Sequence, residues 1–410
     1  MPSYGFERVA NLVDVKQALT ETVNDLEESR ELLLGIQGGR RIVADEASWG
    51  WTAIMVGAGY VFNRADSEGS TGGGALSGGL RGAGKGAIFG AIIDGGYDTN
   101  DINVNALPIY HCAQRDVFLN PTFYTGGTNI LMAPDIGAIL KTIDRYRANM
   151  FFAPPTVWIG LLRHPDFDKY DLSCLTKCYY GASIMPVEVL KELMERLPGC
   201  KVYNYYGQTE LAPYHTILKA EDALAKLGSA GMAGLNMETR LEDADFKPID
   251  AVGTPGEICG KGPHAMIMYF KDPEKTEAAM QGGWFHSGDI GELDDDRYIT
   301  VVDRKKDMIK TGGENVSTRE VEEAVYLDKR VEEVAVIGTP HPKWVEAVTA
   351  VVVPRQGETI TEEEIVALCK KELAGFKVPK NVVFVEALPK TPTGKILKRD
   401  MRQTYADLSK

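Results

Sequence analysis

An amide, a hydroxyl and a carboxylate follow one another at Gln208, Thr209 and Glu210. A carboxylate beside a hydroxyl suits Mg²⁺, which prefers oxygen ligands and is commonly shared with phosphate groups. The aromatic run 203–206 just before them offers flat faces for a purine. An aromatic core strand that ends in a polar turn would explain the same residues without any chemistry. The stretch therefore predicts a nucleotide and metal site only if other segments support it.

A second candidate for phosphate binding is the glycine-rich segment 65–86. Backbone N–H groups of such a loop can close around phosphate oxygens, and Ser70 and Thr71 add hydroxyls. The segment is not a Walker A loop, because no Gly-Lys-Ser/Thr follows at the required spacing. From glycine content alone, a linker without function is the preferred interpretation.

Two charged segments near the C-terminus could also act on a substrate. The run 303–307 (Asp-Arg-Lys-Lys-Asp) lies between two apolar stretches, and it is either a solvated turn or a hinge between domains. Lys395 lies in the loop 389–396, which is stiffened by prolines and broken by Gly394. By composition alone Lys395 is one more solvated lysine.

The composition limits the classes of function. The chain has 410 residues, so we expect more than one domain. A net charge of -13 disfavours nucleic acid as the main partner, because phosphate-backbone binding needs a basic surface. No apolar run is long enough to predict a transmembrane helix, and the N-terminus lacks the order of a signal peptide. We therefore expect a cytoplasmic protein.

Six cysteines are scattered along the chain without a disulfide framework, at positions 112, 174, 178, 200, 259 and 369. Cys174 and Cys178 have no histidine pair nearby, so we expect no zinc site there. Reduced thiols are the preferred interpretation for a cytoplasmic protein.

These residues need elements that hold them in place. Lys201–Tyr206 reads as a strand, and Cys178–Tyr180 as another that ends in Gly181-Ala182-Ser183. From residue 101 to 227, strands alternate with helices, which predicts an α/β fold with a mostly parallel sheet covered by helices. Residues 228–302 read as a small β subdomain, and residues 303–410 as a compact α/β lid. We thus expect a large N-terminal region (1–227), this β subdomain and the mobile C-terminal domain.

Four motifs together resemble a known family. The segments 205–210, 283–289, 302–316 and 392–396 occur in the order typical of the adenylate-forming (AMP-binding) superfamily, and specifically of the fatty-acyl-CoA synthetases. The likeness extends from about Asp101 to the C-terminus. It implies a ligase that joins a carboxylate to ATP, releases pyrophosphate, and then passes the acyl group from acyl-AMP to CoA. The implied cofactors are ATP, Mg²⁺ and CoA.

The resemblance also implies roles for individual residues. Glu210 would bind Mg²⁺, Thr209 would contact phosphate, and Lys395 would stabilise the charge that develops between carboxylate and α-phosphate. Asp289 would bind the ribose hydroxyls and Arg304 ribose or phosphate. The remaining nucleotide-binding positions implied by the family, with Tyr206 stacking on adenine, are Gly181, Ala182, Ser183, Tyr206, Gly207 and Gln208.

The hinge and the acyl pocket are carried over in the same way. Lys306 matches the position about which the lid swings between the two half-reactions. Tyr110, His111, Thr156 and Val157 match positions along the acyl tunnel. An apolar acid of medium to long chain is therefore the expected substrate, and aryl or branched acids stay open.

The chain departs from the family near its N-terminus. Family members usually carry a longer N-terminal region, so we expect this one to be shortened or altered. Gly69, Ser70, Thr71 and Gly72 match the phosphate loop, but Ala75 occupies its lysine position. Two alternatives therefore stay beside the CoA ligase. One is an acyl-AMP ligase that uses another acceptor, and the other is a catalytically impaired protein that binds acyl or nucleotide ligands. The expected partners are a fatty or other carboxylic acid and CoA, and a homodimer stays open.

Overall fold

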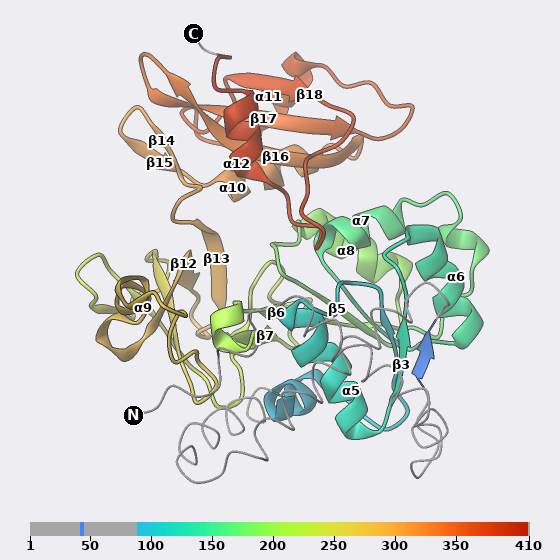
Figure 1. Cartoon of the computed structure of the whole chain (residues 1–410). Helices are drawn as coiled ribbons and strands as arrows, with labels where there is room; N and C mark the ends of the chain where they lie inside the picture. Colours follow the sequence, from blue (N-terminus) through green and yellow to red (C-terminus); the bar gives the residue numbers. More distant parts are fainter. Residues whose placement is uncertain (1–41, 45–87, 409–410) are drawn as a thin grey trace, which may run out of the picture.

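The computed structural model describes residues 42–44 and 88–408. The strands that precede the candidate site belong to its largest sheet, which within the described residues has eight strands in the order β1-β3-β2-β4-β5-β6-β7-β8 (Figure 1). The first six strands of that order pair in parallel, and β7 and β8 pair antiparallel. Their bounds are β1 Ile42–Ala44, β2 Ile102–Asn105, β3 Thr128–Leu131, β4 Met150–Ala153, β5 Lys177–Gly181, β6 Lys201–Tyr206, β7 Thr216–Leu218 and β8 Met232–Ala233. The predicted mostly parallel sheet is confirmed.

Alternate side chains of this sheet enter two separate cores, because successive residues of a strand point to opposite faces. On β5, Cys178 and Tyr180 pack with helices α6, α7 and α8, whereas Tyr179 packs against the helix 88–95 and the π-helix η2. Both faces are therefore covered, as parallel sheets require (Figure 1). The helices beside this sheet are η2 Ala113–Leu119, α5 Asn120–Thr125, α6 Ile136–Tyr146, α7 Pro155–Leu162 and α8 Val187–Arg196.

Helix α6 shows how the sequence builds one of these layers. Ile139, Leu140 and Ile143 form a buried stripe at helical spacing. The side chain of Asp135 accepts a hydrogen bond of 2.7 Å from the N–H of Ala138 and so caps the first turn. The helix spans Ile136–Tyr146 and is one of the helices that alternate with strands in this region, as the sequence predicts.

A second, antiparallel sheet follows the first along the chain. Its strand order is β10-β9-β11-β12-β13, and helix α9 lies at its side (Figure 1). The bounds are β9 Glu238–Glu242, β10 Pro248–Ile249, β11 Gly256–Lys261, α9 Pro273–Ala279, β12 Phe285–Leu293 and β13 Ile299–Arg304. Short 3₁₀ turns η3 Phe167–Lys169, η4 Thr209–Leu211 and η5 Gln281–Gly283 complete the body.

The C-terminal lobe has its own sheet, in which β16 and β17 form a long antiparallel pair and β18 joins β17 in parallel (Figure 1). Its elements are β14 Ile309–Thr311, β15 Glu314–Val316, α10 Thr318–Tyr326, β16 Val331–His341, β17 Val345–Pro354, α11 Glu362–Glu372, β18 Asn381–Phe384 and α12 Lys398–Thr404. The α/β class, with a large N-terminal and a small C-terminal domain, is confirmed. The domain boundaries at 227 and 302 stay predictions.

Two pairs in this lobe, Ser317 with Glu320 and Thr361 with Glu364, have the sequence spacing of a capping box, but only one of them forms it. Thr361 and Glu364 form the full reciprocal box at the start of α11. At the start of α10, Ser317 accepts from the N–H of Glu320, but the Glu320 carboxylate pairs with Lys377 at 2.6 Å. A cation on a neighbouring segment thus takes the carboxylate that would have completed the box.

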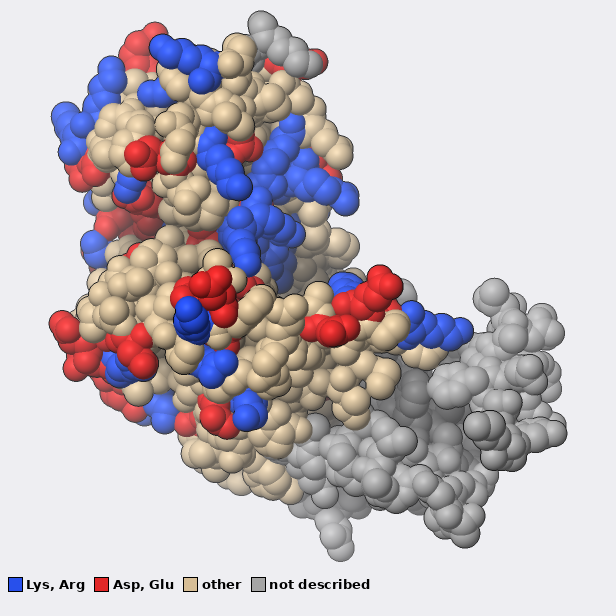
Figure 2. Space-filling model, turned by 90° about the vertical axis from the view of Figure 1, so that its left-hand side faces the viewer, with Lys and Arg blue, Asp and Glu red and all other residues tan. Residues whose placement is uncertain are grey.

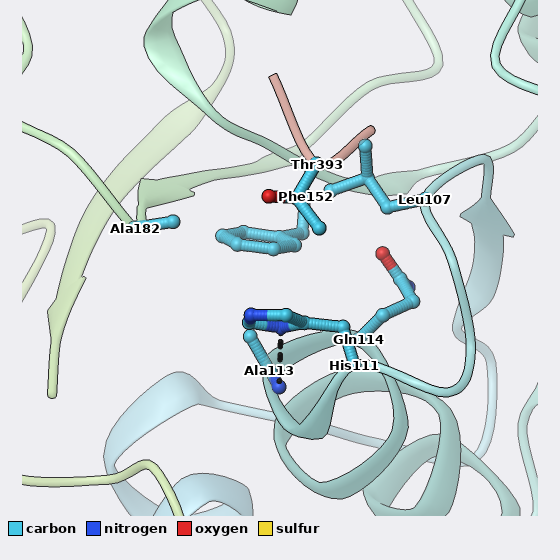
Figure 3. Close-up of a pocket in the computed structure, with 7 residues that line it drawn as sticks. All are labelled: Leu107, His111, Ala113, Gln114, Phe152, Ala182 and Thr393. Carbon is cyan, nitrogen blue, oxygen red and sulfur yellow. Dashed lines mark hydrogen bonds between the residues drawn. The ribbon is translucent and has the colours of Figure 1, made fainter. Parts of the chain in front are cut away.

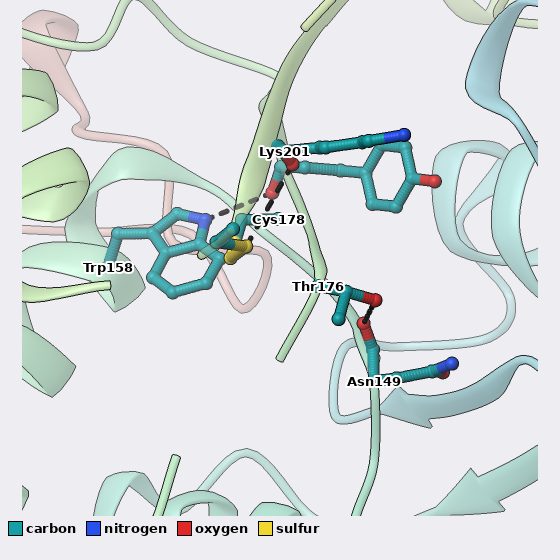
Figure 4. The surroundings of a disulfide bond; sticks show 7 residues. Asn149, Trp158, Thr176, Cys178 and Lys201 are labelled. Carbon is teal, nitrogen blue, oxygen red and sulfur yellow. Dashed lines mark hydrogen bonds between the residues drawn. A yellow bond between two sulfur atoms is a disulfide. The ribbon is translucent and has the colours of Figure 1, made fainter. Parts of the chain in front are cut away.

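A disulfide in the body corrects the expectation that all the cysteines are reduced. Cys178 on β5 and Cys200, which directly precedes β6, are joined, with their Cα atoms 6.1 Å apart (Figure 4). The two strands are neighbours in parallel register, with Cys178 opposite Val202, and this pairing brings the two thiols together. The other four cysteines are free. The cytoplasmic location stays a prediction.

Polar contacts join the C-terminal lobe to the body. Glu323 of α10 accepts from the N–H of Val187 at 3.0 Å, and Arg319 donates to the carbonyl of Gly228 at 3.0 Å. Arg163 of α7 donates to the carbonyl of Glu332. Among the described residues, no helix is long and apolar enough to cross a membrane.

Candidate active site

The candidate site begins where β5 and β6 end side by side. Because both strands run in parallel, their carboxyl ends meet at one edge of the sheet, which is where ligands of α/β folds gather. The backbone is closely packed there. A Cβ on Gly181 would lie 2.2 Å from the carbonyl oxygen of Tyr205, and a Cβ on Gly207 would lie 1.9 Å from that of Pro213. Glycine is therefore required at both positions by space.

Asp289 gathers three of the predicted nucleotide residues around one carboxylate. Tyr206 and Gln208 both donate to its Oδ2, at 2.8 and 2.9 Å. Arg304, which is its cross-strand partner on β13, lies 3.3 Å from its Oδ1. Asp289 is 5% exposed, whereas the Arg304 side chain is half exposed. The structure thus brings residues of the stretch 206–208 together with residues of the β12–β13 hairpin, which lies far from that stretch in the sequence.

Thr209 and Glu210 follow directly in the turn η4. Glu210 Oε1 accepts a hydrogen bond of 2.8 Å from the hydroxyl of Tyr269. Burial raises the pKa of Tyr269 to about 12, and the neighbouring carboxylate adds to the shift. The Thr209 hydroxyl lies 3.2 Å from the sulfur of Cys112. Both side chains therefore lie in the same turn, oriented by residues from other segments.

Lys395 enters this site from the C-terminal lobe. Its loop is closed by hydrogen bonds between Thr391 and Lys395 in both directions, and Gly394 adopts a left-handed conformation (φ +82°). Burial lowers the pKa of Lys395, and the Arg304 guanidinium lowers it further, while Asp289 and Glu210 oppose the shift. The ammonium therefore lies within electrostatic reach of the carboxylates that the nucleotide motifs supply.

A small cavity lies beside the end of β5. Its lining residues are Leu107, His111, Ala113, Gln114, Phe152, Ala182 and Thr393 (Figure 3). The rings of Phe152 and His111 lie on opposite sides of it (Figure 3). His111 Nδ1 accepts from the N–H of Ala113 at 3.2 Å, and burial lowers its pKa, so the imidazole is neutral near pH 7.

The four residues expected in the acyl pocket are not brought together. His111 lines the cavity just described, but Tyr110 next to it is 57% exposed. Thr156 and Val157 line a different hollow, which they share with charged residues of the C-terminal lobe. The reason is local. Residue 110 ends an exposed turn before η2, while 156 and 157 lie in the first turn of α7, which faces the lobe.

The remaining predicted residues are placed as follows. Ala182 has a left-handed backbone (φ +66°), and Ser183 follows it in the bend that leaves β5. Lys306 is exposed in the turn 305–307, directly after β13. The phosphate-loop residues Gly69, Ser70, Thr71 and Gly72, with Ala75, lie outside the described residues.

Sequence reasoning missed Tyr269 and Cys112, which contact Glu210 and Thr209. It also missed Gln114 and Phe152 in the cavity. Tyr269 lies shortly before the capped helix α9, a position that carries no sign of a contact with a turn 59 residues earlier. Phe152 lies in the apolar run 150–153, which is typical of a strand, but that pattern does not indicate which face of the strand borders the site.

Comparison with known proteins gives matches along most of the described chain. The model for "AMP-binding enzyme" matches residues 87–270, and the model for "AMP-binding enzyme C-terminal domain" matches residues 320–395. Feruloyl-CoA synthase of Amycolatopsis sp is 40% identical over 73% of this chain and 61% of its own length. Long-chain-fatty-acid–CoA ligase of Bacillus subtilis is 36% identical over 72% of this chain and 52% of its own length.

Among solved structures, ATP-bound MatB from Rhodopseudomonas palustris is similar, with a TM-score of 0.73 and 32% identity. The alignment covers 79% of this chain and 64% of that one. The chain thus spans less than two thirds of the length of these relatives.

Proposed function

Because the chain belongs to the AMP-binding, adenylate-forming superfamily and within it to the acyl-CoA ligase family, we propose that it is an ATP-dependent acyl-CoA ligase. It would join a carboxylic acid to ATP, with release of pyrophosphate, and then transfer the acyl group from acyl-AMP to CoA. The observation that carries the proposal is that the loop of Lys395 is held against the body at Gly394, which places its ammonium within electrostatic reach of Asp289, Arg304 and Glu210.

In the first half-reaction, the residues at the ends of β5 and β6 would hold the nucleotide. Asp289 would accept from the ribose hydroxyls, since a carboxylate offers two acceptor oxygens. Its Oδ1 is the oxygen to use, because Oδ2 already accepts from Tyr206 and Gln208. Arg304 would then turn its exposed guanidinium from Oδ1 toward ribose or phosphate.

Lys395 would act on the reacting atoms. Its ammonium can offset the negative charge that grows between the attacking carboxylate and the α-phosphate. The partial burial that lowers its pKa also strengthens such an interaction, because charges are screened less away from bulk water. Thr209 would contact phosphate from the turn η4 of the body, whereas Lys395 comes from the C-terminal lobe.

The residues present also fit a magnesium ion. Tyr269 holds Oε1 of Glu210, and Oε2 has no hydrogen-bond partner among the described residues. A free carboxylate oxygen is a ligand that Mg²⁺ prefers. When bound, the ion would neutralise phosphate charge, and the Tyr269 hydroxyl would keep the Glu210 carboxylate in one orientation.

In the second half-reaction, the C-terminal lobe would turn about Lys306 to admit CoA. Lys306 lies in an exposed turn between the last strand of the body and the first strand of the lobe, so a rotation there would not have to move its side chain out of a packed core. Figure 2 shows Lys and Arg side chains gathered where the C-terminal lobe meets the body. Despite the net charge of -13, this region offers cations for the phosphates of ATP and CoA.

The acid is proposed to be a fatty acid of medium to long chain, in line with the long-chain relative. A planar aryl acid is the second candidate, because the Phe152 and His111 rings face each other across the cavity and the relative at 40% identity is named for feruloyl-CoA (Figure 3). Oε1 of Gln114 in the same wall is buried without a partner among the described residues, so it can accept a hydrogen bond from a hydroxyl substituent of such an acid.

Exchange of labelled pyrophosphate into ATP, measured with a panel of acids, tests the adenylation step. Exchange that depends on a fatty or aryl acid supports the proposal, whereas exchange with acetate or amino acids alone contradicts it. Adding CoA and measuring thioester then distinguishes a CoA ligase from an acyl-AMP ligase with another acceptor. A protein that binds nucleotide but gives no exchange with any acid would be the non-catalytic alternative.

A further inference from the structure

Away from the nucleotide site, the antiparallel sheet holds a buried group of metal-ligating side chains. Glu242 on β9, Cys259 on β11 and His286 on β12 have candidate ligand atoms that all lie within 4.8 Å of one another. Glu242 is 2% exposed, Cys259 is fully buried, and the His286 side chain is 7% exposed. Three neighbouring strands therefore bring three ligand types to one place.

The register of the strands explains the grouping. Cys259 and His286 are cross-strand partners on β11 and β12, and Glu242 is the cross-strand partner of Glu257 on β9 and β11. Side chains of cross-strand partners lie on the same face of a sheet. Glu257 and Cys259 are two residues apart on β11, which pairs with β9 in regular register there, so their side chains lie on the same face of the sheet.

The distances fit a tetrahedral ion. The Cys259 sulfur lies 3.4 Å from His286 Nδ1, and a sulfur and a nitrogen bound to one zinc ion lie roughly 3.5 Å apart, given bond lengths near 2.3 and 2.0 Å. Glu257 Oε2 lies 3.8 Å from the same Nδ1 and 3.1 Å from the ammonium of the exposed Lys305, which would have to turn away for this oxygen to become a fourth ligand. Thiolate, imidazole and carboxylate are each ligand types that bind Zn²⁺.

A second observation, independent of the grouping, points to a ligand. Oε2 of Glu242 is buried and has no hydrogen-bond partner in the structure, although Oε1 of the same carboxylate is held by Arg240. Oε2 lies 3.7 Å from His286 Nε2, beyond hydrogen-bond distance. A buried carboxylate oxygen without a donor costs free energy, and a cation would satisfy it.

We propose that Glu242, Cys259 and His286, with Glu257 as a fourth ligand, form a binding site for one Zn²⁺ ion. The site is structural, because the burial of its ligands leaves no path for an acid substrate. Its ligand His286 lies on β12 just before Asp289. Glu257 also accepts a hydrogen bond of 3.0 Å from the N–H of Gly288 on the same strand. Bound zinc would therefore link β12, the strand that carries Asp289, to β9 and β11 and so restrict its movement.

Direct metal binding tests this proposal on the untagged full chain, freed of metal with a chelator. Co²⁺ is the probe, because cobalt bound to a thiolate gives an intense charge-transfer absorption band. We expect one equivalent of Co²⁺ to produce that band and one equivalent of Zn²⁺ to remove it. Cys259→Ser should abolish the band, and Cys369→Ala, which changes another buried free cysteine, should keep it.

Two further measurements guard against variants that fail to fold. Glu242→Gln keeps the shape of the side chain and should weaken Co²⁺ binding by about tenfold or more. Zn²⁺ should raise the Tm of the parent protein and leave that of Cys259→Ser unchanged. Absence of a band in the folded parent, or an equal band in Cys259→Ser, would show that the three side chains are only a hydrogen-bonded group.

Discussion

The hydroxyl of Thr156 on α7 donates a hydrogen bond of 2.9 Å to the carbonyl of Gly394, which lies 238 residues later in the chain. The fit is close, because a Cβ on Gly394 would lie 2.8 Å from the Thr156 oxygen. This contact holds the residue before Lys395 against the body. The structure therefore has the C-terminal lobe in an orientation that brings Lys395 to the candidate site, as the proposed adenylation step requires.

Removal of the Lys395 ammonium should separate the two half-reactions. We expect Lys395→Ala to slow formation of acyl-AMP by about a hundredfold, which is the typical effect of losing one preorganised charge donor. Synthesis of thioester from supplied acyl-AMP should stay largely intact, because it uses the other orientation of the lobe. Both rates are measured on the same preparation, with Lys371→Ala, an exposed lysine of α11, as the control. Adenylation near the parent rate would exclude the proposed role.

The lowered pKa of Lys395 should appear in the pH dependence of adenylation. An amine is cationic below its pKa, so a lowered pKa removes the cation at a lower pH than in an exposed lysine, which titrates near about 10.4. We expect kcat/KM for ATP, which reports the free enzyme, to fall on the alkaline side below that value. The residual activity of Lys395→Arg should lack this fall, because arginine stays charged. An alkaline fall shared by both proteins would assign it to another group.

The hydroxyl of Tyr269 should control the metal requirement. Tyr269→Phe removes the hydrogen bond to Glu210 Oε1 and leaves the ring in place. Hydrogen bonds to charged groups contribute about 1.5–3 kcal/mol, so we expect the Mg²⁺ concentration for half-maximal adenylation to rise by roughly tenfold. Tyr124→Phe, at an exposed tyrosine, is the control. An unchanged Mg²⁺ titration would mean that Tyr269 does not orient the ligand.

Rotation at Lys306 should matter mainly for the thioester step. Proline fixes φ, so Lys306→Pro is expected to restrict the turn 305–307 and to slow transfer to CoA more than adenylation. Lys306→Ala keeps the backbone free and should retain both steps. An equal loss of both half-reactions in the proline variant would indicate misfolding in place of a blocked rotation.

Gly207 should be intolerant of any side chain. A Cβ at this position would lie 1.9 Å from the carbonyl oxygen of Pro213, so Gly207→Ala forces the backbone apart at the start of the site. We expect the free energy of unfolding in urea to fall by about 1–3 kcal/mol. Gly199→Ala, where no atom lies within 4 Å of the new Cβ, should leave stability unchanged or slightly raised. Equal stability of both variants would contradict the close packing described here.

Much of the fold could be predicted, because local patterns and tertiary packing agree in the parallel sheet. The strand Met150–Ala153 and the helix that begins at Val187 coincide with an apolar run and a helical pattern that prolines delimit in the sequence. Helix 88–95 was missed, because it follows a glycine-rich segment that suggests only a loop. The π-helix η2 was missed as well, because no sequence pattern distinguishes a π-helix from an α-helix or a loop.

The site could be predicted where one segment carries several of its residues, as at 206–210. Contacts between residues of different segments could not be predicted from the sequence. The pairing of Tyr269 with Glu210 depends on how a loop of the second sheet folds back over the first. The disulfide between Cys178 and Cys200 depends on strand register, which the sequence does not state.

That disulfide lies beside the indole of Trp158, which is 1% exposed and donates to the carbonyl of Tyr179 at 3.0 Å (Figure 4). Disulfides quench the emission of a neighbouring indole, and an indole shielded from water emits at the blue end of the tryptophan range. Reduction of the Cys178–Cys200 bond should therefore brighten the blue edge of the protein's intrinsic fluorescence. The fluorescence of Trp158 can therefore be used to follow reduction of this disulfide in the core of the large sheet.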